Sequence, residues 1–183
     1  MIFTLAFCLS LVAAGAAANS VGTNKEATNL DIRKMVDVNE TLVVLMRKHS
    51  NQTKVRCQSA KKAQKENETQ YQYTLRARVK GGAVPKYVEN NVTVTLEKIG
   101  ASENYSSTYT QDGIKYNLTL KQMESNGDCF VIFVHKSDGQ QGCELIAPLS
   151  KLNNTLRECK KYYKERCNGT NFALYKPRKC NYK

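Results

Sequence analysis

The run Cys-Phe-Val-Ile-Phe-Val-His over 129–135 is the feature that most constrains how this chain folds. A strand with one face in solvent is apolar only at alternate positions. In this run both alternating sets are apolar, which predicts a strand covered on both faces. From Pro148 to Arg166, apolar residues recur at three- and four-residue steps with basic residues between them. We therefore expect a helix over 148–166 that packs on the outside of this strand.

Alternation of polar and apolar residues predicts more strands before this run. It is clearest over 70–80, where each second residue from Tyr71 to Val79 is apolar. The pair Asp112-Gly113 is a turn signal between two more strand-like runs. The remaining predicted elements are a short helix over 29–36, strands over 41–46, 53–59, 87–99 and 143–147, and a charged connector over 61–69. About eight strands in up-and-down order predict a mainly β fold, an antiparallel barrel that can hold one small ligand.

The first residues predict a signal peptide over 1–18. Ile2 to Val12 is apolar and uncharged, and small residues lead to a cleavage point near Ala18. The run is shorter than the roughly 20 residues of a membrane-spanning helix. We therefore expect a secreted, extracellular protein without a membrane span, with one domain over 19–183. Loss of Cys8 with the leader leaves six of the seven cysteines, which predicts three disulfides of undetermined pairing.

Asn-X-Ser/Thr sequons support a secretory route and also predict which way strand residues face. A glycosylated asparagine points to solvent, so Asn91 predicts that Val92, Val94 and Leu96 point into the barrel. In the same way, Asn117 predicts that Tyr116, Leu118 and Leu120 of its own strand point inward. The eight candidate glycosylation sites are Asn39, Asn51, Asn67, Asn91, Asn104, Asn117, Asn153 and Asn168.

The formal net charge of +12 and the small number of histidines bear on the class of function. A basic surface attracts polyanions, so weak polyanion binding is one possibility, and a plain solvated surface is the other. With only His49 and His135, and with no nucleophile-elbow or glycine-rich phosphate motif, we expect no catalytic residues, no metal site and no cofactor.

The last third of the chain resembles a known family. The strand Cys-Phe-Val-Ile-Phe-Val, the segment Gly-Cys-Glu-Leu over 142–145, and the later Cys159, Cys167 and Cys180 resemble the secreted lipocalins of tick saliva, the histamine-binding-protein-like group. The resemblance implies an eight-stranded lipocalin barrel with a ligand chamber and a C-terminal helix packed outside. It also implies the disulfides Cys57–Cys180, Cys129–Cys159 and Cys143–Cys167.

These pairings and the strand patterns together predict the chamber lining. If Cys129 faces the helix, then Val131 and Phe133 lie under the helix. Glu144 is the one inward carboxylate, or else an edge-strand charge, and Arg56 is an anchor for a lipid carboxylate, or else an exposed strand residue. The tyrosines line the chamber or simply pack in the core. The candidate ligand-binding residues are Leu42, Val44, Arg56, Tyr71, Tyr73, Leu75, Val94, Leu96, Tyr116, Leu118, Phe130, Ile132, Val134 and Glu144.

This lining favours an apolar ligand with one or two polar groups. We therefore expect a monomeric lipocalin that sequesters a small host ligand, such as a fatty acid, an eicosanoid or a sterol, and so modulates host inflammation or immunity. One alternative is a scavenger of biogenic amines such as histamine or serotonin. Another is a protein that binds a host immune protein or cell through its outer surface.

Overall fold

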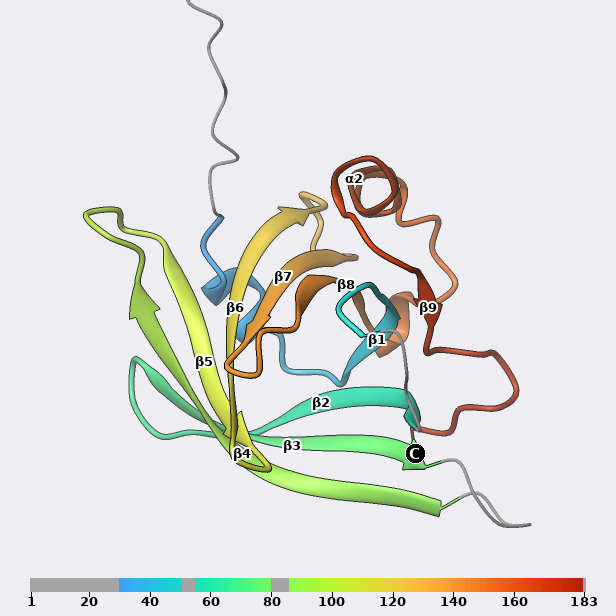
Figure 1. Cartoon of the computed structure of the whole chain (residues 1–183), viewed down its shortest axis with the longest axis horizontal. Coiled ribbons are helices and arrows are strands. Elements are labelled where there is room, and N and C mark those ends of the chain that lie inside the picture. The colour runs from blue at the N-terminus through green and yellow to red at the C-terminus, as the bar shows by residue number, and fades with distance from the viewer. Residues whose placement is uncertain (1–29, 51–54, 80–85, 183) are drawn as a thin grey trace, which may run out of the picture.

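The computed structural model describes residues 30–50, 55–79 and 86–182, and these form a closed β-barrel with a helix on its outside (Figure 1). The predicted signal peptide, the sequon at Asn51 and the turn over 81–85 lie outside the described residues. The elements are α1 (Arg33–Val36), β1 (Leu42–Arg47), β2 (Val55–Lys65), β3 (Gln70–Val79), β4 (Lys86–Lys98), β5 (Tyr105–Gln111), β6 (Ile114–Met123), β7 (Phe130–Lys136), β8 (Gln141–Pro148), the 3₁₀ helix η1 (Leu149–Lys151), α2 (Arg157–Arg166) and β9 (Phe172–Ala173).

Strands β2 to β8 are antiparallel neighbours in chain order, and β1 closes the sheet. Along most of its length β1 pairs with β8, and at its start Leu42 and Val43 also pair with Ala60 and Ser59 of β2. The predicted eight-stranded antiparallel barrel is therefore confirmed.

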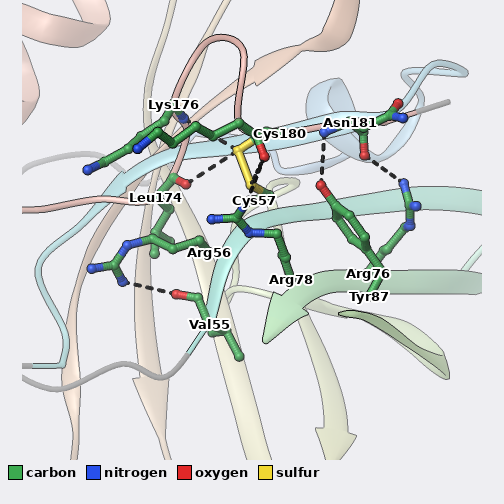
Figure 2. The surroundings of a disulfide bond; sticks show 11 residues. Val55, Arg56, Cys57, Arg76, Arg78, Tyr87, Leu174, Lys176, Cys180 and Asn181 are labelled. Atoms are coloured by element: carbon green, nitrogen blue, oxygen red, sulfur yellow. Dashed lines mark hydrogen bonds between the residues drawn. A yellow bond between two sulfur atoms is a disulfide. The ribbon is translucent and has the colours of Figure 1, made fainter. Parts of the chain in front are cut away.

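The C-terminal tail completes the barrel where β1 and β2 separate. Strand β9 pairs with the end of β1, and the amide of Leu174 donates to the carbonyl of Leu45 at 2.9 Å. On the other side, the amide of Cys57 in β2 donates to the carbonyl of Leu174 at 3.0 Å. The disulfide Cys57–Cys180 then ties β2 to the end of the tail (Figure 2). Because Leu174 bonds to both strands, the tail takes the place of direct pairing between them.

Helix α2 covers the outer face of β7 and β8 (Figure 1). Val131 and Leu145 point outward into an apolar cluster with Tyr163 of the helix, while Phe130 and Ile132 belong to a second cluster inside the barrel. Both faces of β7 are thus buried, as its sequence predicts. The disulfides Cys129–Cys159 and Cys143–Cys167 join these strands to α2, so the structure has the three pairings that the family resemblance implies.

Two boundaries differ from the sequence prediction. The predicted helix over 148–166 begins only at Arg157, since Pro148 leads into the 3₁₀ turn η1 and Leu156 has a left-handed backbone with φ of 50°. The predicted charged connector over 61–69 is wrong over its first half, because β2 continues to Lys65 and pairs with Tyr71. Charged residues are compatible with a strand whose outer face is in water.

The short helix α1 closes one end of the barrel. Ile32, Met35 and Val36 are buried against the inner cluster. The hydroxyl of Tyr73 in β3 donates to the carbonyl of Val36 at 3.0 Å, and the amide of Ile32 donates to the carbonyl of Tyr105 at 3.1 Å. These bonds fix α1 to β3 and β5, two strands that flank β4 in the sheet, and the buried α1 residues make this end of the barrel apolar.

The sequons in the described residues lie at the surface or near it. Asn91 points outward from β4 while Val92, Val94 and Leu96 are buried, which is the facing predicted from glycosylation. Asn104 and Asn117 are half-buried, and the exposed sequon asparagines are Asn39, Asn67, Asn91, Asn153 and Asn168. Their glycosylation remains a prediction.

The tail disulfide should contribute more to stability than the shorter bridge at α2. Replacing Cys57 and Cys180 by serine removes a disulfide between residues 123 positions apart in the sequence. We expect this to lower the free energy of unfolding by about 4–5 kcal/mol. The matched double variant Cys143→Ser with Cys167→Ser removes a disulfide between residues 24 positions apart. It should lower the free energy of unfolding by about 3 kcal/mol. Denaturant unfolding measures both. A larger loss from the second pair would contradict the role given to the tail.

Candidate ligand-binding chamber

The barrel encloses a chamber of about 390 Å³, within the size range of small-molecule sites. Its apolar part begins at the closed end, against α1, and continues along the inner faces of the strands. Side chains that alternate along these strands form this part of the wall, which suits a hydrocarbon body. The apolar lining comprises Met35, Val36, Leu42, Val44, Leu75, Val94, Leu118, Ile132, Val134 and Ile146.

The other end of the chamber is polar because β1 contains a bulge. Its register with β8 shifts between Val44 and Met46, and an extra residue in a strand reverses the facing of every residue that follows. Met46, which regular alternation predicts to point inward, packs with the outer cluster instead. Arg47 and His49 line the chamber in its place.

Arg47 is a buried cation with incomplete hydrogen bonding. The residue is 7% exposed, and its Nη1 donates to Oε1 of Gln58 at 3.2 Å. Its Nε is buried and has no hydrogen-bond partner among the described residues. Burial lowers the pKa of the guanidinium, and the charge of Glu144 acts in the opposite direction. Arginine nevertheless stays protonated in proteins, so a positive charge faces the chamber.

The side chains of Glu144 and His49 form a hydrogen-bonded pair in the chamber wall. Nε2 of His49 lies 2.7 Å from Oε1 of Glu144, and both side chains are largely buried. Nδ1 of His49 and the hydroxyl of Ser107, also in the lining, are buried without a partner in the described chain. Buried polar atoms are nearly always hydrogen-bonded. Together with Nε of Arg47, these atoms form a set of polar groups that a ligand could satisfy.

Two tyrosines and a lysine also line the polar end, and the remaining polar residues of the lining are Gln58, Ser59, Arg76, Asn90, Gln111 and Asp112. The rings of Tyr109 and Tyr116 stack with centroids 4.6 Å apart. Burial raises the pKa of Tyr109 well above its ordinary value; it also raises that of Tyr116, with the charge of Glu144 adding to it. Both hydroxyls therefore stay neutral. Lys136 is buried, its Nζ lies 5.3 Å from the centroid of the Tyr116 ring, and burial lowers its pKa.

Most of the residues predicted from sequence meet in this chamber. Three others, Tyr71, Leu96 and Phe130, pack in the barrel core and do not line it. The sequence reasoning missed Arg47, His49 and Lys136, whose facing depends on the bulge and on the strand ends. The predicted residues in the lining are Leu42, Val44, Tyr73, Leu75, Tyr116, Val94, Leu118, Ile132, Val134 and Glu144.

Of the two interpretations of Arg56, the one that points it into the chamber is wrong. Its Nη1 donates to the carbonyl of Val55 at 3.0 Å and it does not line the chamber, whereas Gln58, on the other side of Cys57, does. The cause is a second irregularity, because the register of β2 shifts between Arg56 and Ser59, and Cys57 has a φ of 52°. A prediction that assumes regular alternation on both sides of Cys57 is therefore wrong for Arg56.

A closed eight-stranded antiparallel barrel with one chamber and an external C-terminal helix defines a lipocalin-type ligand-binding protein. The family model described as tick histamine binding protein matches residues 22–182, so the chain belongs to this family. Among solved structures it is similar to japanin from Rhipicephalus appendiculatus bound to cholesterol. The TM-score is 0.53 and the identity 8%, over 76% of this chain and 95% of japanin. No curated protein matches the chain.

The family is one of ligand-binding proteins, and the three disulfides together with the family suggest secretion. In the described part of the chain, no helix is long and apolar enough to cross a membrane. The same residues contain no group of three side chains suited to hold a metal ion.

Core residues and lining residues should differ in their effect on stability. Phe130→Ala removes a fully buried ring and should lower the free energy of unfolding by about 3–5 kcal/mol. Leu118→Ala removes a half-buried side chain that borders an open chamber, so we expect a loss of about 1 kcal/mol. Urea unfolding compares the two variants. Equal losses would contradict the placement of the chamber wall.

Proposed function

We propose that this protein binds and sequesters a small host ligand with an apolar body and an acidic head group, as in fatty acids and eicosanoids. The observation that carries the proposal is the buried guanidinium of Arg47 in the wall of an otherwise largely apolar chamber. The apolar body would lie toward α1, and the acidic group would lie at the polar end.

The charge balance of the polar end supports an anionic head group. Burying a cation without a partner is costly, and a carboxylate is the partner that a guanidinium pairs with best. Arg47 donates to one neutral amide oxygen only, and Lys136 adds a second buried cation nearby. Glu144 is already paired with His49. A ligand carboxylate would therefore gain two cations and displace no existing salt bridge.

The same arrangement is less suited to the two alternative ligand classes. A cationic amine would have to compete with His49 for Glu144 and would face repulsion from Arg47 and Lys136. A sterol hydroxyl could bond to Ser107 but would supply no anion to hydrogen-bond with the guanidinium of Arg47. The cholesterol in the japanin structure is a property of that protein, because a likeness at 8% identity supports only a shared fold.

Sequestration needs no chemistry beyond binding. A secreted protein with this chamber would lower the free concentration of a lipid mediator in host tissue, and inflammation driven by that mediator would fall. Such a role requires affinity and abundance rather than turnover, and an apolar chamber wall with a few charged groups at one end would provide the affinity.

The role of Arg47 is testable by comparing it with Arg56, which lies outside the chamber. We expect Arg47→Gln to weaken binding of a fluorescent polyunsaturated fatty acid roughly tenfold to hundredfold, because hydrogen bonds to charged groups contribute about 1.5–3 kcal/mol. Arg56→Gln should leave this binding unchanged. Fluorescence titration of both variants against the unmodified protein measures the effect, and circular dichroism checks the fold.

Binding of the methyl ester of the same fatty acid separates the contribution of the carboxylate charge to affinity from that of the apolar contacts. The unmodified protein should prefer the acid over the ester, and Arg47→Gln should bind the two alike. If the unmodified protein binds acid and ester equally, the anionic head group is excluded. If histamine or serotonin binds more tightly than the fatty acid, the amine alternative replaces this proposal.

A further inference from the structure

A basic surface surrounds the disulfide Cys57–Cys180, outside the chamber (Figure 2). We call it the tail patch. Its members come from β2, β3 and the C-terminal tail, and none of them lines the chamber. The patch consists of Arg56, Arg78, Lys176, Arg178 and Lys179, of which the three tail residues are exposed and the two arginines of the strands are half-buried.

The fold brings these like charges together although they are distant in sequence. Arg56 and Arg78 are direct cross-strand partners in β2 and β3, a placement that is unfavourable for two charges of the same sign. Nη1 of Arg78 donates to the carbonyl of Lys179 at 3.0 Å, and the adjacent Cys180 is bonded to Cys57. The tail is therefore held over the two strand arginines, and the positive charge is concentrated rather than spread.

The tail patch lacks acidic partners in the described part of the chain. Other exposed lysines of the protein have them, such as Lys65 with Glu68 and Lys98 with Glu103. No patch residue forms an ion pair with a described carboxylate. Arg76, which Figure 2 shows beside the disulfide but which is not a patch residue, is paired with Glu89 at 3.1 Å. A cluster of cations without such partners creates a positive potential that attracts anionic groups.

The neighbouring aromatic rings argue against single-stranded nucleic acid as the partner, because binding of single strands relies on open rings for base stacking. The ring of Tyr87 is covered by the guanidinium of Arg76 at 4.1 Å, and its hydroxyl accepts from the amide of Asn181. Tyr175 and Tyr182 stack on each other, with centroids 6.3 Å apart. These rings are occupied, so the patch offers charge without a stacking surface.

We infer that the tail patch binds sulfated glycosaminoglycans. Sulfate groups repeat along such a chain and carry no apolar or aromatic part, which matches a surface of lysine and arginine side chains alone. The guanidinium fork of arginine suits tetrahedral oxyanions, and lysines add unspecific attraction. Binding here would retain a secreted protein at sulfated cell surfaces and matrix, while the chamber stays available to its own ligand.

The test compares two variants that each lose three positive charges. In one, Lys176, Arg178 and Lys179 of the tail patch become glutamine. In the control, the exposed Lys160, Lys161 and Lys164 of α2 become glutamine. Affinity for immobilised heparin is measured over a range of salt concentrations. We expect the tail variant to bind roughly tenfold more weakly, the control to bind nearly as the unmodified protein, and all binding to weaken with salt.

Three outcomes would overturn the inference. If the two variants lose equal affinity, binding follows net charge and not the tail patch. If single-stranded DNA binds to the patch as tightly as heparin does, the surface is not selective for sulfated polysaccharide. If vesicles with anionic phospholipids bind more tightly than heparin, a membrane is the partner. Fatty-acid titration of the tail variant should be unchanged, so a failure here is distinct from a failure of the chamber proposal.

Discussion

The disulfides between α2 and the strands β7 and β8 are the constraint on which the rest of the structure depends. They hold a helix over strands whose outer faces are apolar, with Cys129 and Cys143 on the strand side. Because the residues on the outer face of β7 pack against the helix, the alternation of a strand places Phe130, Ile132 and Val134 on the inner face. The inner wall of the barrel is thus determined by contacts made on its outside.

The architecture was predictable because it depends on regular patterns. Alternation identified β3 and β4, an apolar run on both faces identified β7, and turn residues separated the remaining strands. The start of α2 was not predictable from its apolar stripe. Leu149 and Leu152 continue the helical spacing, but the chain first makes a 3₁₀ turn and enters α2 through Leu156 in a left-handed conformation. The spacing of apolar side chains predicts which of them face the barrel, but it does not predict the backbone conformation between them.

At the polar end of the chamber Glu144 and Tyr116 were predicted, but Arg47 was not, for a different reason. Period-two reasoning assumes an unbroken strand, and β1 and β2 are both irregular where they reach this end. The bulge in β1 turns Arg47 inward in place of Met46, and the shift in β2 turns Arg56 away from the chamber. Each irregularity shifts the register by only one residue, yet the one in β1 exchanges an apolar side chain for a charged one in the chamber wall. The apolar lining, formed by regular strand segments, was largely correct.

The central claim is that a ligand lies in the barrel with its acidic group at Arg47. A crystal structure of the protein with a long-chain fatty acid tests this most directly. The account predicts the carboxylate within hydrogen-bond distance of the Arg47 guanidinium, with the hydrocarbon chain directed toward Met35 and Val36 of α1. A fatty acid bound with its carboxylate at the α1 end, or bound only on the outer surface, would contradict it.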